Sequence, residues 1–406
     1  MSSRGIASFL LLTLTLAAPL AAQSLLLVEA PGPQPVFTEF TGPPALPCLY
    51  PNGPQLQVHP YSINGPCPKL TPIGGSPSIL GDIAVNRVLD QVYIADGKRI
   101  GVFDASSGVQ LNVMDLATLA MGNTTGLGYD AATNRLWITD GGTVTAATPS
   151  AAGSCLSPTP VLSWPSTIGT LTDLSWHPGT GLLWVCTAGG SIAAYTSAGA
   201  LALAPYAAGV SCPLPMQLKG LEADPSTGCG GLLPQLFVSD GMRINHELAG
   251  TGTAAPPSFA FPTNCLVLGF AQQTAGLAYS ARAITYGAGT GPTLGTAGGQ
   301  TVLPNPAFTL TLAGGPPGGQ AWLVVGTGAA CPPLNFFGNP WYVNPFITTF
   351  GPFTLPASGA LSLPAPLTGP AGPLPCGTTV FMQWVCRSTS FAWTSSAGLE
   401  FTASLP

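Results

Sequence analysis

Residues 81–85 read Gly-Asp-Ile-Ala-Val, and residues 92–97, after a short turn, read Val-Tyr-Ile-Ala-Asp-Gly. A small or acidic residue opens the first apolar run, and the second run ends at an Asp-Gly break. Each run is short enough for a β-strand, and the polar residues between them are typical of a tight turn. This pair of strands is the unit from which the fold is inferred.

The unit recurs along the chain at intervals of roughly 40–50 residues, which is the spacing typical of β-propeller blades. A fifth copy, at residues 275–279, is truncated. The sequence therefore predicts an all-β, five- or six-bladed β-propeller. The run Leu-Leu-Leu-Val at residues 25–28 is expected to be an edge strand, and an N-terminal strand is expected to complete the last blade. The other complete copies are TGLGY/LWITDG (125–129, 136–141), TDLSW/LWVCT (172–176, 183–187) and KGLEA/LFVSDG (219–223, 236–241).

The ends of the chain differ from the repeats. Residues 1–22 combine Arg4, an apolar run and Pro-Leu-Ala-Ala, which is the pattern of a secretory signal peptide. Four further apolar runs, bounded by Pro-Gly turns, predict a small β-sandwich at the C-terminus. The expected organisation is a signal peptide (1–22), a propeller (23–286), a linker (287–300) and a sandwich (301–406). The protein is thus expected to be exported to the periplasm, the cell surface or the medium.

Composition narrows the possible partners. Only 6% of the residues are charged, and the net charge is −5 without a basic patch, which argues against nucleic acid. The 52 glycines and 44 prolines coexist with 46% hydrophobic residues, so many tight turns between buried strands are expected. No apolar run after residue 22 is long enough to span a membrane.

The ten cysteines are even in number, which in an exported chain predicts disulfides. Plausible pairs are Cys48–Cys67, Cys212–Cys229 and Cys376–Cys386. Cys186 lies within an apolar strand and is expected to be a buried thiol.

The repeated phrase resembles that of NHL-repeat and gluconolactonase-like propellers. The tail resembles a module appended to many exported bacterial proteins, through Asn-Pro-x-Phe (305–308), Gly-Gly-Pro-Pro-Gly (314–318) and Met-Gln-Trp (382–384). It departs from that module at residues 396–398, where Ser-Ala-Gly replaces Ser-Asn-Gly/Ala. The first resemblance implies a metal on the propeller axis, and the second implies no activity.

The residues that open the inner strands are the only place where the repeat itself proposes a site. These residues are Asp82, Gly126, Asp173, Gly220 and Gly276. Together with Glu222, the two aspartates form a candidate site for a divalent cation such as calcium. The simpler alternative is that Asp82 and Asp173 accept hydrogen bonds from backbone amides where the strands converge.

Catalytic motifs are otherwise missing from the sequence. Of the three histidines, His177 is expected in a solvated turn, and His246 in an outer strand or loop. Asp96, Asp140 and Asp240 each precede a glycine, so turn formation is the expected role of all three.

Aromatic residues are concentrated in the tail, where core packing is the expected role and stacking on sugar rings is the alternative. Together these observations predict a non-catalytic binding or cell-surface interaction protein with a protein or carbohydrate ligand. The alternative is a metal-dependent, lactonase-like hydrolase acting at the propeller axis. The aromatic residues are Phe336, Phe337, Trp341, Tyr342, Phe346, Phe350 and Phe353.

Overall fold

The computed structural model of the 406-residue chain describes strands at residues 24–29, 36–41 and 55–60 and most of the chain from residue 80 onward. From there the described ranges are 80–150, 157–209, 217–227, 233–241, 243–253, 265–267, 274–281, 283–365, 367, 374 and 376–406. The predicted signal peptide and the pairs Cys48–Cys67 and Cys212–Cys229 lie outside them. The chain divides into two compact units, one built mainly from Leu56–Ser280 and the other mainly from Ala281–Leu405.

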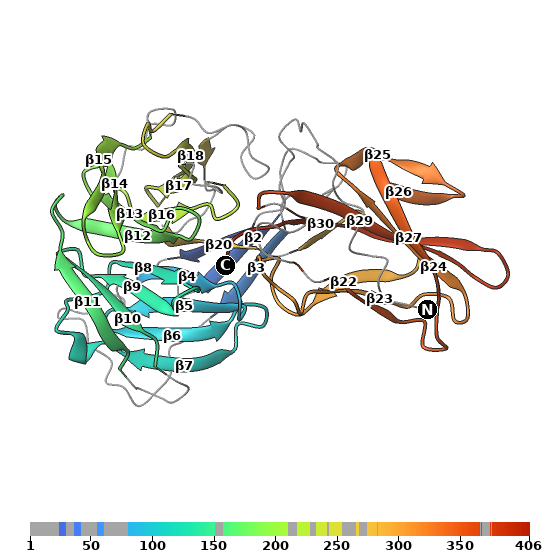
Figure 1. Cartoon of the computed structure of the whole chain (residues 1–406), viewed down its shortest axis with the longest axis horizontal. Coiled ribbons are helices and arrows are strands. Elements are labelled where there is room, and N and C mark those ends of the chain that lie inside the picture. The colour runs from blue at the N-terminus through green and yellow to red at the C-terminus, as the bar shows by residue number, and fades with distance from the viewer. Residues whose placement is uncertain are drawn as a thin grey trace. The chain divides into compact units, whose positions relative to one another are not determined.

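Four sheets of the first unit are each built from four consecutive antiparallel strands (Figure 1). The outer strand of the first sheet is followed by a short 3-10 helix, η2 (Ala117–Leu119). The sheets are β4 (Leu80–Asn86), β5 (Gln91–Asp96), β6 (Arg99–Asp104) and β7 (Gln110–Asp115); β8 (Gly126–Asp130), β9 (Arg135–Thr139), β10 (Thr143–Thr148) and β11 (Thr159–Pro165); β12 (Leu171–His177), β13 (Leu182–Thr187), β14 (Ser191–Thr196) and β15 (Leu201–Ala207); and β16 (Gly220–Ala223), β17 (Gln235–Ser239), β18 (Arg243–Leu248) and β19 (Cys265–Val267).

The fifth sheet joins the two ends of this unit. Its inner strand is β20 (Thr274–Ser280), and the strands β1 (Ser24–Glu29), β2 (Val36–Thr41) and β3 (Gln55–Pro60) follow in that order. The truncated fifth repeat supplies one strand, so the N-terminal segment completes the sheet with three. The edge-strand prediction for residues 25–28 is therefore wrong, because β1 pairs with β20 on one side and with β2 on the other.

The inner strands form a closed ring, in which β4, β8, β12, β16 and β20 are neighbours in turn and β20 returns to β4. This arrangement of five four-stranded sheets confirms the all-β propeller. Of the predicted numbers of blades, five or six, the structure has five. The apolar residues of the repeated unit fill the space between adjacent sheets. Trp137, for example, packs with residues of β12 and β13, and Trp184 packs with residues of β16 and β17.

The Asp-Gly breaks form turns, as predicted. Oδ1 of Asp140 accepts hydrogen bonds from the amides of Gly142 and Thr143 at 3.0 and 2.8 Å. Gly141, which directly follows Asp140, has a φ of +90°, a conformation that glycine adopts at little cost. Asp96 forms an ion pair with Arg99 at the equivalent turn.

The second unit contains a five-stranded sheet, a three-stranded sheet and a two-stranded hairpin. The five-stranded sheet has the order β21-β30-β29-β24-β27, the three-stranded sheet the order β22-β23-β28, and β25 pairs with β26. The strands are β21 (Ile284–Tyr286), β22 (Thr293–Ala297), β23 (Thr309–Ala313), β24 (Gln320–Gly326), β25 (Ala329–Phe336), β26 (Asn339–Val343), β27 (Phe346–Thr354), β28 (Leu361–Pro364), β29 (Thr379–Arg387) and β30 (Trp393–Thr402).

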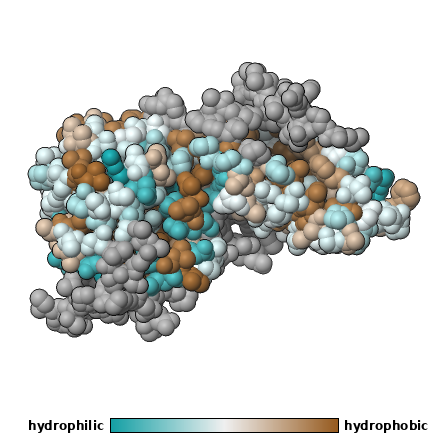
Figure 2. Space-filling view, turned by 60° about the horizontal axis from the view of Figure 1, so that its bottom comes forward, coloured by the Kyte–Doolittle hydropathy of each residue, from teal (hydrophilic) through white to brown (hydrophobic). Residues whose placement is uncertain are grey.

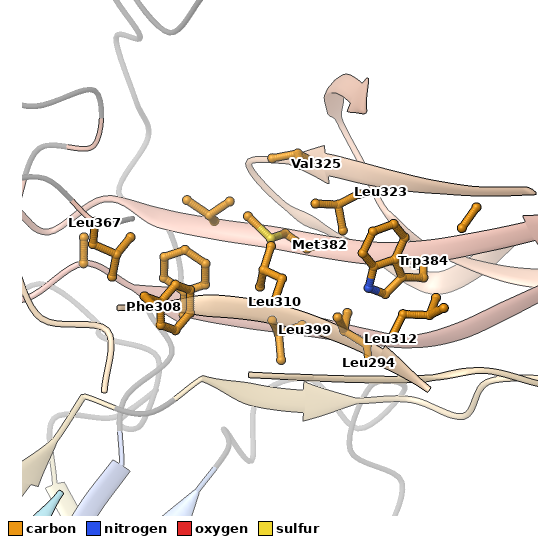
Figure 3. Close-up of a cluster of buried hydrophobic side chains, with 14 of the residues drawn as sticks. Leu294, Phe308, Leu310, Leu312, Leu323, Val325, Leu367, Met382, Trp384 and Leu399 are labelled. Carbon is orange, nitrogen blue, oxygen red and sulfur yellow. The ribbon is translucent and has the colours of Figure 1, made fainter. Parts of the chain in front are cut away.

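Both larger sheets contribute to one hydrophobic core, shown in Figure 3. Leu294, Leu310 and Leu312 come from the three-stranded sheet, and Met382 and Trp384 come from the five-stranded sheet. Cys386 lies in the same core as a free thiol, so the predicted Cys376–Cys386 bridge is wrong. Burial raises the pKa of this thiol to about 12.

The predicted linker, residues 287–300, is not a simple connection. It contains β22, which pairs with β23 and buries Leu294 in the core. Its Gly- and Thr-rich composition suggested a loop, but a strand at the side of a sheet needs only one buried face. The predicted end of the propeller at residue 286 also lies too far toward the C-terminus, because β21 pairs with β30 of the second unit.

Candidate functional site

The five inner strands bring the predicted axial residues close together. A Cβ atom added at Gly126 would lie 2.8 Å from the Cα atom of Asp173, and one added at Gly276 would overlap Oδ1 of Asp82. Side chains at these glycines would thus collide with the neighbouring strand. Glycine at positions 126 and 276 is explained by this crowding, because the neighbouring strands leave no room there for a Cβ atom.

Asp82 and Asp173 are both completely buried, and each binds the next blade through its side chain. Oδ2 of Asp82 accepts a hydrogen bond from the amide of Leu127 at 2.6 Å, and Oδ2 of Asp173 accepts one from the amide of Leu221 at the same distance. Oδ1 of Asp173 also accepts from the amide of Leu174. This confirms the simpler alternative, in which the two carboxyls accept hydrogen bonds from backbone amides where the strands converge.

The two carboxyls also interact with each other. Burial raises the pKa of Asp82 to about 8, although hydrogen bonds from Asp173 and the Leu127 amide oppose the shift. Burial, followed by the charge of Asp82, raises the pKa of Asp173 well above its usual range. Two carboxyls in contact cannot both ionise cheaply, so the pair holds at least one proton at neutral pH.

Glu222 does not join this pair. It forms a buried salt bridge with Arg87 at 2.7 Å and accepts hydrogen bonds from Ser175 Oγ at 2.6 Å and from the amide of Tyr279 at 3.0 Å. Arg87 also donates from Nε to the carbonyl oxygen of Tyr279. This network links four of the five blades, since these residues belong to or follow β4, β12, β16 and β20.

The structure thus separates the predicted metal-binding set into a carboxyl pair and a salt bridge. Asp82 keeps its proton up to about pH 8, because burial raises its pKa, and would have to lose that proton before it could act as an anionic oxygen ligand. Within the described part of the chain, no group of three or more Asp, Glu, His or Cys residues is arranged to hold a metal ion.

His177 and His246 are both buried, so the prediction of a solvated His177 is wrong. Nε2 of His177 lies 3.0 Å from the carbonyl oxygen of Thr227, and burial lowers the pKa of His177 to about 4. His246 lies in β18 and stacks on Phe237 with ring centroids 4.5 Å apart. Burial lowers the pKa of His246 to about 3. Both side chains fill the propeller as neutral rings.

The carboxyl pair makes stability depend on pH in a defined direction. Folded Asp82 keeps its proton up to about pH 8, whereas the unfolded chain releases it near 3.8. The folded state therefore binds more protons between these values, and the free energy of unfolding falls as the pH rises through them. An amide at position 82 can still accept from Leu127 and can donate to Asp173. We therefore expect Asp82→Asn to gain stability relative to the wild type between pH 5 and pH 9, measured by urea denaturation.

Asp104→Asn is the matched control for this series. Hydrogen bonds from Ser106 and Ser107 lower the pKa of Asp104 to about 2, so its charge is constant from pH 5 to pH 9. Its stability difference from the wild type should therefore be constant over this range. An Asp82→Asn difference that is equally constant would contradict a raised pKa of Asp82.

A second candidate site lies on the five-stranded sheet of the C-terminal unit, on the face opposite the hydrophobic core. Here Arg387 pairs in register with Trp393 of β30 on one side and with Gln320 of β24 on the other. The guanidinium carbon lies 5.1–5.7 Å from the ring centroids of Phe391, Trp322 and Trp393. These distances are within the range of cation–π attraction.

The hairpin β25–β26 and the start of β27 extend this group. Phe336 lies 5.5 Å from Trp393, Phe337 stacks on Trp393 at 5.5 Å with an interplanar angle of 10°, and Trp341 lies 5.0 Å from Phe336. We call the whole set the surface aromatic cluster. Its members are Trp322, Phe336, Phe337, Trp341, Phe346, Phe391 and Trp393, of which Trp322, Phe391 and Trp393 lie against Arg387.

Two members of this cluster have an unusual backbone. Phe337 and Phe391 adopt left-handed conformations, with φ of +49° and +65°, at the tips of tight turns. They are also 69% and 71% exposed. A bulky residue is strained at positive φ, and exposure forfeits the stabilisation that burial of its ring would bring. Such outliers are concentrated at functional sites.

The tail aromatics predicted to pack in the core are therefore divided. Phe350 and Phe353 pack against the core, and Tyr342 is buried with its hydroxyl bonded to the backbone of Ala288. For Phe336, Phe337, Trp341 and Phe346 the expected core role is wrong. Sequence reasoning missed Trp322, Phe391, Trp393 and Arg387. One signal was present: Arg387 and Glu400 are the only charged residues from 283 to 406.

Comparisons with protein-family models and with curated proteins found no match. A solved structure to which the chain is similar is the crystal structure of RRP9 WD40 repeats, with a TM-score of 0.30 and 10% sequence identity. The match covers 43% of this chain and 52% of the other, about half of its length. None of the described residues forms a helix with the length and hydropathy needed to cross a membrane.

Proposed function

We propose that this chain is an exported, non-catalytic binding protein in which the propeller is a rigid scaffold and the surface aromatic cluster holds a carbohydrate ligand. The observation that carries the proposal is the pair of strained, exposed phenylalanines, Phe337 and Phe391. Glycine or asparagine would fit these turns at lower cost, and the chain uses glycine freely elsewhere. The strain is compensated if the rings contact a ligand.

The chemistry of the cluster matches a sugar. One face of a pyranose ring is made of C–H groups that pack on an aromatic ring, and its edge carries hydroxyl groups. Hydroxyl side chains border the cluster, including Ser388 and Ser390, whose Oγ atoms lie 2.8 Å apart. In the space-filling view of Figure 2, apolar residues of the chain reach the surface among weakly polar ones. The cluster itself combines exposed aromatic rings with one charged side chain, which suits an uncharged or weakly charged ligand.

The signal-like residues 1–22 and the resemblance of the tail to modules of exported bacterial proteins support export. The NHL-like phrase supports a propeller that acts as a scaffold. The alternative, a lactonase-like hydrolase, would place the reaction at Asp82 and Asp173. Complete burial and bonding to backbone amides make these carboxyls poor ligands for a catalytic ion.

The test compares binding with stability in one variant. Phe391→Asn removes the exposed ring but suits the left-handed backbone, so we expect an unchanged or higher free energy of unfolding, by up to about 1 kcal/mol. The same variant should no longer bind the glycans that the wild-type chain binds on a glycan array. Leu89→Asn, at an exposed propeller turn, is the matched control and should still bind them.

Two outcomes would contradict the proposal. One is that the wild-type chain binds no glycan on the array, or that Phe391→Asn binds as well as the wild type. The other is hydrolysis of a lactone in the presence of calcium that disappears in Asp82→Asn, which would establish the enzyme instead.

A further inference from the structure

The charge of the surface aromatic cluster carries a more specific inference. Arg387 is the only basic residue from 283 to 406, and its guanidinium lies against Trp322, Phe391 and Trp393 of the cluster. The one acidic residue of this segment, Glu400, is completely buried, and burial raises its pKa well above the usual range. The segment therefore presents one positive charge that no carboxylate of its own neutralises.

The guanidinium retains donors for a ligand. It carries five N–H groups, and Nη2 donates to Oε1 of Gln320 at 2.5 Å. No other hydrogen bond of this side chain is made to a described residue, and Arg387 is only half-buried. Its position is fixed by Trp322 and Trp393 beside it and by Gln320 in the adjacent strand. A planar fork held in this way is suited to a carboxylate, which it binds through two parallel hydrogen bonds.

We propose that the ligand is an acidic polysaccharide whose sugar carboxylate binds Arg387 while its ring faces stack on Phe337 and Phe391. This inference rests on the proposed function and adds the chemical class of the ligand. A single cation, rather than a basic patch, fits a ligand that presents one carboxylate per sugar among apolar ring faces. An anionic membrane is a poorer fit, because recognition of anionic lipids takes clusters of four to eight basic residues.

The experiment uses the chain without residues 1–22 and two matched probes, oligogalacturonate and its fully methyl-esterified form. We expect the acid to bind about tenfold to a hundredfold more tightly than the ester in calorimetric titrations, because a charged hydrogen-bonded pair is lost with the ester. Arg387→Gln should weaken binding of the acid to the level of the ester and leave binding of the ester unchanged. Arg387→Lys keeps the charge without the fork and should fall between the two.

Phe391→Asn separates stacking from charge, because it should weaken binding of both probes by a similar factor. Equal binding of acid and ester, unaffected by Arg387→Gln, would overturn the inference and leave the proposed function standing. If the wild-type chain binds neither probe, the inference of an acidic polysaccharide is overturned. If it also binds no glycan on the array, the proposed carbohydrate-binding function is overturned as well. Self-association in sedimentation velocity that Phe391→Asn abolishes, or binding to anionic vesicles but not to oligogalacturonate, would also overturn it.

Discussion

Replacement of Arg87 by methionine is expected to lower the free energy of unfolding of the propeller by about 3–5 kcal/mol. Arg87 is the ion-pair partner of Glu222 at 2.7 Å, and both side chains are buried. Without the guanidinium, the carboxylate would be left in a site whose burial already raises the pKa of Glu222. The cost should be smaller at pH 5 than at pH 8, because protonation of Glu222 removes the unpaired charge.

The double variant Arg87→Met/Glu222→Met distinguishes a lost ion pair from lost packing. If the penalty comes from an unpaired charge, the double variant should be more stable than Arg87→Met. Arg135→Met, at the half-buried start of β9, is the control and should change stability by less than about 1 kcal/mol. Guanidinium denaturation followed by tryptophan fluorescence measures all three. Equal losses for Arg87→Met and Arg135→Met would show that the buried pair contributes little.

Gly276→Ala is expected to destabilise the propeller by about 3 kcal/mol, the upper part of the range for an overpacked core. The added methyl group would overlap Oδ1 of Asp82 and lie 3.0 Å from its Cα atom. Asp82 cannot move aside freely, because its other oxygen is bonded to the amide of Leu127. Relief of the overlap would therefore separate β20 from β4, at the point where the ring closes.

A double-variant cycle locates this clash. Gly276→Ala should cost less in an Asp82→Ala background, because the carboxyl that meets the methyl group is gone. Gly189→Ala is the control. The nearest atom to its added Cβ, Oγ1 of Thr187, is 3.8 Å away, so a change within about 0.5 kcal/mol is expected. Additive effects of Gly276→Ala and Asp82→Ala would contradict contact between the two positions.

Local patterns predicted the blades well. In the repeat at residues 172–187, the apolar positions that the phrase singles out are those buried in β12 and β13. The Asp-Gly breaks were also correctly predicted as turns, because the conformation depends on adjacent residues. The linker prediction failed because strand pairing is not a local property. Apart from Leu294, residues 293–297 are polar or small, and their pairing with β23 depends on residues 309–313.

The candidate sites were less predictable. The alignment of the repeats identified Asp82 and Asp173 as equivalent positions, and their hydrogen bonds to the next blade were among the alternatives. Their mutual contact was not predictable, because they are separated by 91 positions in the sequence and meet only in a closed ring. The groups that donate to Glu222 are the guanidinium of Arg87, the hydroxyl of Ser175 and the backbone amide of Tyr279. They come from three other blades, and no spacing in the sequence connects them.

Repeated four-stranded β-sheets were predictable from the sequence, since alternation within a strand and the residues of a turn are local properties. The tertiary structure was needed to show that three N-terminal strands complete the fifth blade and that the buried side chains of Asp82 and Asp173 interact. It also showed that Trp322, Phe391 and Trp393 lie around Arg387. Each of these arrangements depends on which strands lie side by side, and that is set by packing between residues far apart in the chain.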